Sequence, residues 1–505
     1  MNLFERKTKI NLVPDAVMEP VVDYVCTWST QGQVCGNGKT VRDVLTHDAL
    51  FGENGWAYHL SPDVRKNFIF LLDDGWDLPY SVDGEDVKDY YGSFIVDPVK
   101  FPGYGDTPVA RLKTLSDNVR KAGWAGLGVW VCCQEDAFHK TTDGRWDEAY
   151  WIEKILWSKE AGITYWKNDW GNHAYTHEWR QFVSRAANEL YPELIMEHIT
   201  GDYGTNDPKG TGTCEGRIQN MLRCASYSDV FRSYDVTTQL SVATTMDRVT
   251  RLLKDIQILP GDHMGLLNCE DELYLAAALG LSAGVMRSPL NHPHNLDEIP
   301  RLAAWHRIAP PFDMSAYDNT ISESILTDEW FFSSSDTWDA TIHNLTVQQH
   351  SAAAVSRGTD LPTARSINPP FMAAARNPIT GAVSLVTLPR TQMGLVNIPL
   401  HTDISWNVGP LTGPIGIFGA YRSLQLTFNR SIEGLQILAQ DLMDTEACDV
   451  TPFVTVQDNT LILDGELIHA LGLMAGSSGD RSEPGLVLHI GNQENWDPIP
   501  PRKER

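Results

Sequence analysis

Short apolar runs alternate with longer stretches of helical periodicity along roughly the first 310 residues of the chain. Short apolar runs are typical of strands that are buried on both faces of a sheet. The pattern predicts eight strands, at residues 21–28, 67–73, 126–132, 163–169, 194–197, 229–232, 264–268 and 283–288.

Helices are predicted between these strands from their periodicity and their end signals. The clearest spans 108–121, where Pro108 lies in the first turn and Gly123 follows the last one. The others span 146–161, 177–190, 244–259, 270–281 and 296–308. Eight strands alternating with helices favour a (β/α)8 TIM barrel, of fold class α/β. A doubly wound open sheet is the alternative, but no G-x-G-x-x-G follows the first strand.

The pattern changes after about residue 315, where short strand-like runs are separated by turn residues. The runs lie at 341–348, 383–388, 423–428, 435–439, 453–456, 460–463 and 485–490. Asp458-Asn459 between two of them predicts a hairpin. We therefore expect an N-terminal extension (1–19), a catalytic barrel (20–315) and a C-terminal antiparallel β-sandwich domain (316–505).

Composition narrows the class of protein. The 505 residues are 42% hydrophobic and 21% charged, as in globular proteins. A formal net charge of −25 argues against nucleic-acid and membrane partners. We expect no signal peptide and no membrane span, and the eight cysteines show no metal-finger spacing. We expect a cytoplasmic protein with reduced thiols and with no metal or cofactor.

Two carboxylate motifs lie at the carboxyl ends of the second and fourth predicted strands. One is Asp73-Asp74-Gly75-Trp76, and the other is Lys167-Asn168-Asp169. The carboxyl ends of barrel strands carry the active sites of TIM-barrel enzymes. Lys167 and Asp169 share one face of their strand, so the lysine could keep Asp169 ionised as a nucleophile. The alternative is a structural Lys–Asp pair.

A pair of carboxylates can split a glycosidic bond. One attacks the anomeric carbon or activates water, and the other protonates the leaving oxygen. The chain also has 16 tryptophans, and indole rings next to acids suit the apolar faces of sugars. Most tryptophans in proteins, however, are core or interface residues, so this feature alone is weak.

The motifs together resemble glycoside hydrolase clan D, the α-galactosidase-like families 27 and 36, over roughly residues 20–310. The Asp-Asp and Lys-x-Asp motifs match, and Trp28 resembles an aromatic residue of the first strand near the sugar. Glu197 resembles the family 27 glutamate that contacts the 2-hydroxyl. The segment from Arg232 to Asp235 resembles the Arg–Asp motif that carries the acid/base.

The chain departs from the family pattern at three positions. Asp235 follows Arg232 by three residues, where family 27 has four, so Asp229 is a second candidate acid. His263 stands where the family has an acid before the seventh strand, and Glu197-His198 lacks the usual Trp-Gly. These departures fall at sugar-facing positions, so they bear on which glycone is bound more than on which reaction is catalysed.

The resemblance implies a retaining exo-α-glycosidase, above all an α-galactosidase, with Asp169 and Asp235 as catalytic residues. The implied substrate-binding residues are Trp28, Asp73, Asp74, Trp76, Trp130, Lys167, Glu197, Arg232 and His263. The loop at 201–216 is either a lid or an ordinary solvated loop. Alternatives are a glycosidase or transglycosylase for another glycone (β-L-arabinopyranoside, α-N-acetylgalactosaminide) and an inactive sugar-binding protein. The expected partner is a small oligosaccharide or glycoside, and a homo-oligomer is compatible with the sequence.

Overall fold

The first half of the chain contains eight parallel strands. The structure is a computed structural model, and it describes residues 4–36, 38–60, 62–78, 92–136, 139, 145–199, 214–233, 242–256, 264–290, 294–332, 345–392 and 396–491. The strands are β1 (Tyr24–Cys26), β2 (Ile69–Leu72), β3 (Gly126–Val131), β4 (Ile163–Asn168), β5 (Ile195–His198), β6 (Val230–Arg232), β7 (Leu266–Asn268) and β8 (Gly284–Val285). Their order is β7-β6-β5-β4-β3-β2-β1-β8, and a parallel bridge from Asn268 to Ser282 closes the ring. The predicted (β/α)8 barrel is confirmed.

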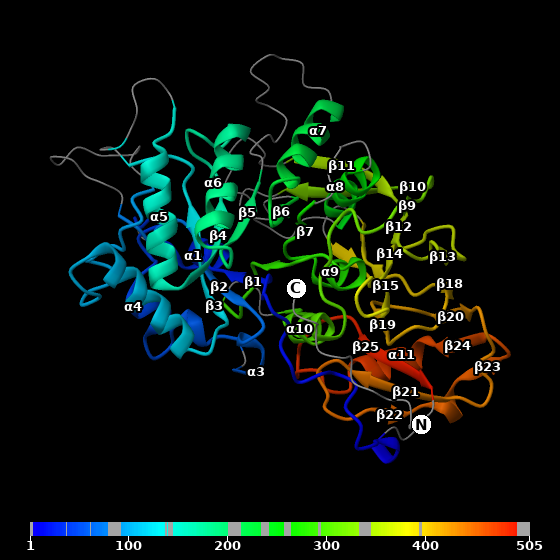
Figure 1. Ribbon diagram of the computed structural model, residues 1–505. Helices are drawn as coiled ribbons and strands as arrows, with labels where there is room; N and C mark the ends of the chain where they lie inside the picture. The colour runs from blue at the N-terminus through cyan, green and yellow to red at the C-terminus, as the bar shows by residue number, and fades with distance from the viewer. Residues whose placement is uncertain are drawn as a thin grey trace.

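Helices surround the strands (Figure 1). They are α4 (Pro108–Lys121), α5 (Glu148–Ala161), α6 (His177–Leu190), α7 (Cys214–Ala225), α8 (Val242–Asp255), α9 (Leu273–Leu279) and α10 (Glu298–Ile308). Between β1 and β2 lie the shorter α1 (Trp28–Val34), α2 (His47–Phe51), η2 (Trp56–Tyr58) and α3 (Pro62–Arg65). α4 begins where the hydroxyl of Thr107 accepts the N–H of Ala110, and α5 ends at Gly162, whose φ of 72° suits glycine.

The second half of the described chain is built mainly from two packed sheets. The larger contains β9 (Asn319–Ile321), β12 (Ala354–Arg357), β14 (Phe371–Arg376), β15 (Val383–Leu388), β19 (Ile415–Phe418), β21 (Gln436–Asp441), β22 (Cys448–Asp449) and β25 (Gly485–Gly491). The smaller contains β13 (Thr363–Ala364), β18 (Asp403–Gly409), β20 (Ser423–Phe428), β23 (Thr455–Gln457) and β24 (Thr460–Asp464). Apolar side chains of both sheets, among them Ile417 and Trp406, form one buried cluster.

Not all neighbours in these sheets are antiparallel. The pairs β12/β14, β15/β19 and β18/β20 are parallel. The reason is that the chain changes sheet between successive strands: β18 and β20 lie in the smaller sheet, and β19 between them lies in the larger one. A local strand pattern does not record such a crossover. The hairpin predicted at Asp458-Asn459 is present between β23 and β24.

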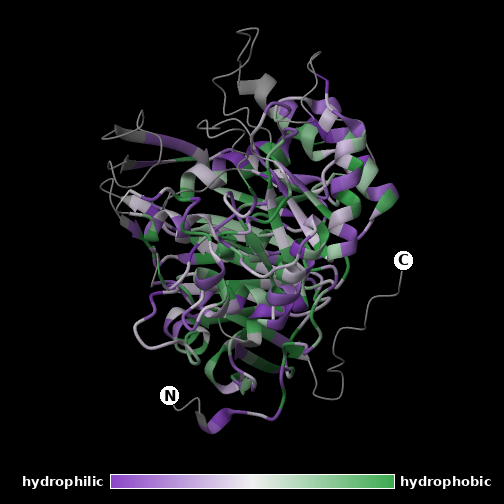
Figure 2. Cartoon of the chain, turned by 90° about the vertical axis from the view of Figure 1, so that its left-hand side faces the viewer, coloured by the Kyte–Doolittle hydropathy of each residue, from purple (hydrophilic) through white to green (hydrophobic). Residues whose placement is uncertain are grey.

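Three smaller elements accompany the two sheets. β10 (Ile325–Phe332) and β11 (Leu345–Ala352) form an antiparallel ribbon that packs against α8. β16 (Arg390–Gln392) pairs with β17 (Val396–Ile398), and α11 (Gly465–Gly472) packs on β21, β24 and β25. Figure 2 shows hydrophobic residues concentrated on the central strands and hydrophilic ones more often on the outer helices.

The barrel and the larger sheet share a buried interface. The Trp305 ring on α10 lies 5.7 Å from the Phe418 ring on β19. On the same helix, Arg301 Nε and Nη2 lie 3.1 Å and 3.2 Å from the Asp441 carboxylate, and both side chains are fully buried. The N-terminal segment also contacts this sheet, because the Leu12 N–H donates to Gln440 Oε1 at 2.6 Å. The predicted domain boundaries stay predictions.

Among the described residues, no helix combines the length and the apolar character needed to cross a membrane. The cysteines whose surroundings the structure describes are all free thiols: Cys26, Cys35, Cys132, Cys133, Cys224, Cys269 and Cys448.

The buried pair at the interface gives a test of domain coupling. Arg301→Met should destabilise the protein by about 3–5 kcal/mol, because it leaves the Asp441 carboxylate buried without its cation. The double variant Arg301→Met/Asp441→Asn should be more stable than the single one, since the second change removes that charge. Thermal unfolding measures both effects. A midpoint unchanged by Arg301→Met would contradict the buried ion pair.

Candidate active site

Asp169 lies at the carboxyl end of β4, next to two hydrogen-bond or charge partners. Trp130 on β3 donates its indole N–H to Asp169 Oδ2 at 3.0 Å, and Arg232 Nη2 on β6 lies 3.4 Å from Oδ1. Burial alone would raise the pKa of this carboxyl. The positive charges of Arg232 and Lys167 and the hydrogen bond from Trp130 lower it by more, so the net pKa lies below its ordinary value. Asp169 is therefore ionised at neutral pH, and 17% of its side chain is exposed.

The backbone around Asp169 is held by several contacts. The Cys133 N–H donates to the Trp170 carbonyl at 2.8 Å, and Arg180 Nη2 donates to the Asp169 carbonyl at 3.1 Å. Gly171 has φ 137°, and a Cβ there would lie 2.7 Å from the Cys133 backbone. Only glycine permits this close approach, so the turn after β4 fixes where the Asp169 carboxylate points.

Lys167 contacts Asp73 directly. Its Nζ lies 2.7 Å from Asp73 Oδ2, and both side chains are almost completely buried. Asp73 also receives the Cys26 thiol at 3.0 Å, and its backbone N–H donates to Thr27 Oγ1 at 2.9 Å. The lysine therefore joins β4 to β2 through an ion pair, and its charge still lowers the pKa of Asp169.

Asp74 is paired with Arg42, a residue that the sequence did not single out. Arg42 Nε lies 2.8 Å from Asp74 Oδ1. Burial raises the pKa of Asp74 to about 7, although Arg42 opposes that shift. Arg42 comes from the segment between β1 and β2, and no local motif marks it. Only the folded chain brings it to Asp74.

Arg232 lies beneath Asp169 and connects three strand ends. Its side chain is fully buried, with Nε 3.6 Å from Glu197 Oε1 and Nη1 3.4 Å from Glu270 Oε1. Glu197 on β5 also accepts hydrogen bonds from the Tyr165 hydroxyl and from Asn268 Nδ2, both at 2.8 Å. Burial raises the pKa of Glu197, and Arg232 counteracts it. The structure thus places Glu197, 1% exposed, below the mouth of the barrel.

Glu270 was not among the predicted site residues. It follows β7 with a φ of 51°, which is strained for a residue other than glycine. The Asn268 side chain holds this conformation, because its Oδ1 accepts the Glu270 N–H at 2.7 Å. The position of Glu270 directly after the seventh strand was the available sequence signal.

The predicted tryptophans occupy different positions. Trp76 is 1% exposed and donates its indole N–H to the Trp130 carbonyl at 2.9 Å, so its side chain is buried and hydrogen-bonded to the backbone of β3. Trp28 is partly buried at the first position of α1, beyond the carboxyl end of β1. Trp130 is 2% exposed and reaches Asp169 through its N–H.

The candidate acids have separate outcomes. Asp229 lies before β6, at its amino end, and its carboxylate accepts the Met196 N–H at 2.8 Å. Asp169 lies at the opposite, carboxyl end of the barrel strands, so the location of Asp229 argues against its role as the acid. Asp235, His263 and residues 201–213 lie outside the described residues, so their predicted roles are not tested.

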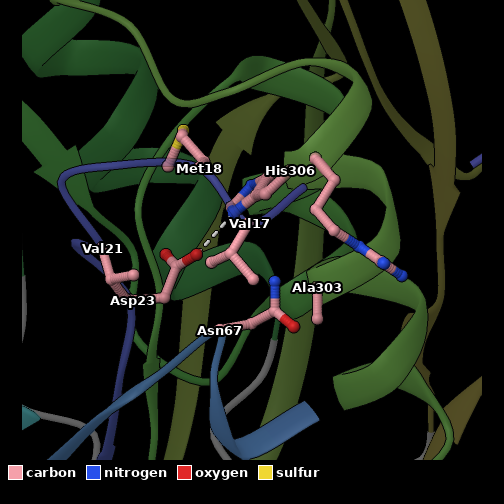
Figure 3. A pocket seen from close by; sticks show the side chains of 8 residues that line it. Val17, Met18, Val21, Asp23, Asn67, Ala303 and His306 are labelled. Atoms are coloured by element: carbon pink, nitrogen blue, oxygen red, sulfur yellow. Dashed lines mark hydrogen bonds and ion pairs between the residues drawn. The ribbon is translucent and has the colours of Figure 1, made fainter. Parts of the chain in front are cut away.

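A small pocket lies at the opposite end of the barrel (Figure 3). Asp23 before β1 and Asn67 before β2 line it, together with His306 of α10. His306 Nδ1 lies 2.6 Å from Asp23 Oδ2, and Asp23 Oδ1 accepts the Ala283 N–H at 2.8 Å. The pocket has room for about one water molecule. Within the described ranges, no cluster of His, Cys, Asp and Glu could hold a metal ion.

A comparison with models of protein families found no match, and neither did a comparison with curated proteins. Solved structures are similar over nearly the full length of both chains. α-Galactosidase I from Mortierella vinacea is 12% identical, with 93% of this chain and 97% of that chain covered and a TM-score of 0.43. A family 27 β-L-arabinopyranosidase from Geobacillus stearothermophilus in complex with arabinose is 10% identical, with 97% and 99% covered and a TM-score of 0.38.

An α-galactosidase from Saccharomyces cerevisiae is 11% identical, with 94% of this chain and 98% of that chain covered and a TM-score of 0.38. Similarity at this level does not decide the function. The case for a function therefore depends on the residues around Asp169.

Proposed function

We propose that this protein is a retaining exo-α-glycosidase that hydrolyses terminal α-galactosides. The observation that carries the proposal is the Asp169 carboxylate, kept ionised by Arg232 and Lys167 and oriented by the Trp130 N–H at the mouth of the barrel. An oriented, ionised and partly exposed carboxylate is what a glycosidase nucleophile requires. The motifs shared with clan D assign the same role to Asp169.

The proposed reaction is a double displacement. Asp169 attacks the anomeric carbon, and the bond from that carbon to the leaving oxygen breaks as Asp235 donates a proton to the oxygen. Water then attacks the anomeric carbon of the glycosyl ester while Asp235 takes a proton from that water, and the Asp169 carboxylate is released. The assignment of Asp235 rests on the sequence motif. It stands two residues after Ser233, the last described residue beyond β6.

The glycone is the less constrained part of the proposal. Glu197 was expected to accept a hydrogen bond from the 2-hydroxyl, but both of its oxygens have partners within the protein. The preference for galactose, and the preference over α-N-acetylgalactosaminide, therefore rest on the clan D resemblance. The cytoplasmic location also stays a prediction.

A panel of nitrophenyl glycosides tests the reaction and the glycone together. We expect the fastest release of nitrophenol from the α-galactoside, with slower release from β-L-arabinopyranoside and α-N-acetylgalactosaminide. Faster turnover of either of the other two substrates would change the assignment of the glycone but leave the proposed mechanism in place. No release from any of the three glycosides would contradict the proposed enzyme and favour the sugar-binding alternative.

The same panel tests the nucleophile. Asp169→Asn should lose at least about 10³-fold in kcat, because a neutral amide cannot form the glycosyl ester. Asp229→Asn is a matched control: it makes the same chemical change at the amino end of β6, and its amide oxygen can still accept the Met196 N–H. It should keep near-normal activity. A folded Asp169→Asn protein with normal turnover would remove Asp169 from the mechanism.

The acid/base is tested by the dependence on the leaving group. Asp235→Ala should lose about 10²–10⁴-fold on an alkyl or sugar leaving group, and much less on an activated dinitrophenol that departs without protonation. The ratio of kcat/KM between the two substrates measures this difference. An equal loss on both substrates would show that Asp235 does not protonate the leaving oxygen.

A further inference from the structure

Trp170 directly follows the proposed nucleophile and has an unusual environment for a tryptophan of this chain. Most of the tryptophans whose burial is described are buried, whereas Trp170 is 46% exposed. Its ring contacts the Trp130 ring at a centroid distance of 5.7 Å. Trp130 in turn donates to Asp169. The two indoles therefore form a continuous aromatic wall from the nucleophile to the solvent.

The backbone that carries this exposed indole is fixed. The Trp170 carbonyl accepts the Cys133 N–H at 2.8 Å, and the His173 N–H donates to the Cys133 carbonyl at 2.8 Å. Gly171 packs against the Cys133 backbone so closely that no side chain fits there. A large ring on a fixed backbone loses little conformational entropy when a ligand covers it. Exposure of the ring thus coincides with preorganisation for binding.

We propose that Trp170 is a platform for the leaving group, and that it stacks on the flat apolar face of a sugar or aryl aglycone. The inference rests on the proposed function, because an exo-acting enzyme encloses the terminal sugar and leaves the aglycone on the solvent side. The side chains of Asp73 and Lys167 are almost completely buried, whereas the Trp170 ring is 46% exposed and so remains accessible to the part of a substrate outside the pocket. Stacking against an indole suits both the C–H face of a pyranose and an aryl ring.

The test compares substrates that share the glycone and differ in the aglycone: an α-linked disaccharide, a nitrophenyl glycoside and the methyl glycoside. Trp170→Ala should lower kcat/KM about 3- to 10-fold more on the disaccharide and the nitrophenyl substrate than on the methyl glycoside, which has no face to stack. Trp170→Phe should recover part of this difference. A selective loss on the disaccharide alone or on the aryl substrate alone would identify which aglycone the platform serves.

Tyr58→Ala is the control, because Tyr58 is 43% exposed in η2 between β1 and β2. It should leave all three rates near those of the wild type, and thermal unfolding should confirm that each variant folds. Equal losses on all three substrates in a folded Trp170→Ala protein would overturn the platform and leave the glycosidase intact. A wild-type protein that cleaves none of the substrates would overturn both proposals.

Discussion

The buried guanidinium of Arg232 is the interaction on which the candidate site depends. It lies between the carboxylates of Asp169, Glu197 and Glu270, which come from the ends of β4, β5 and β7. Isolated carboxylates at this depth would take up protons, because burial disfavours their charge. A fixed cation among them lowers that cost. It also ties neighbouring strand ends to one point, directly beside the Asp169 carboxylate that it helps to keep ionised.

The remaining contacts divide the barrel into two ends with different roles. At the carboxyl ends, Lys167 and Asp73 form a second buried ion pair, and Arg42 holds Asp74. At the amino ends, Asp23 and His306 link the segment before β1 to α10, and Asp229 accepts a hydrogen bond from the backbone of β5. The first set lies at the end of the barrel where TIM-barrel enzymes bind ligands, while the second joins elements within the barrel.

Sequence patterns predicted the fold wherever local chemistry determines it. The bounds of α4 and α6 were correct, because end signals and periodicity act within a few residues. Several strands were predicted too long at their carboxyl ends: residue 28 already begins α1, and Asp73 and Asp169 lie beyond β2 and β4. The parallel pairs in the C-terminal sheets were not predictable, because they depend on which sheet each strand joins.

The same limit applies to the site. Lys167, Asp169 and Asp73 stand in motifs at strand ends, and the structure brings them together. The partners Arg42 and Glu270 lie far from those motifs in sequence, so only the closed barrel reveals them. Glu197 also stands in a motif, and its contact with a sugar stays a prediction. Its partners in the barrel, the Tyr165 hydroxyl and the Asn268 amide, both donate to Oε2 and are likewise apparent only in the folded chain.

Covalent trapping of the nucleophile tests the central claim most directly. A 2-deoxy-2-fluoro galactosyl fluoride slows hydrolysis of the glycosyl ester more than its formation, so a retaining enzyme accumulates the ester. Mass spectrometry of the digested protein should then find one fluorosugar on the peptide that contains Asp169, and none after Asp169→Asn. A label on another carboxylate would contradict the assignment of the nucleophile. Turnover with an inverted first product and no label would contradict the double displacement itself.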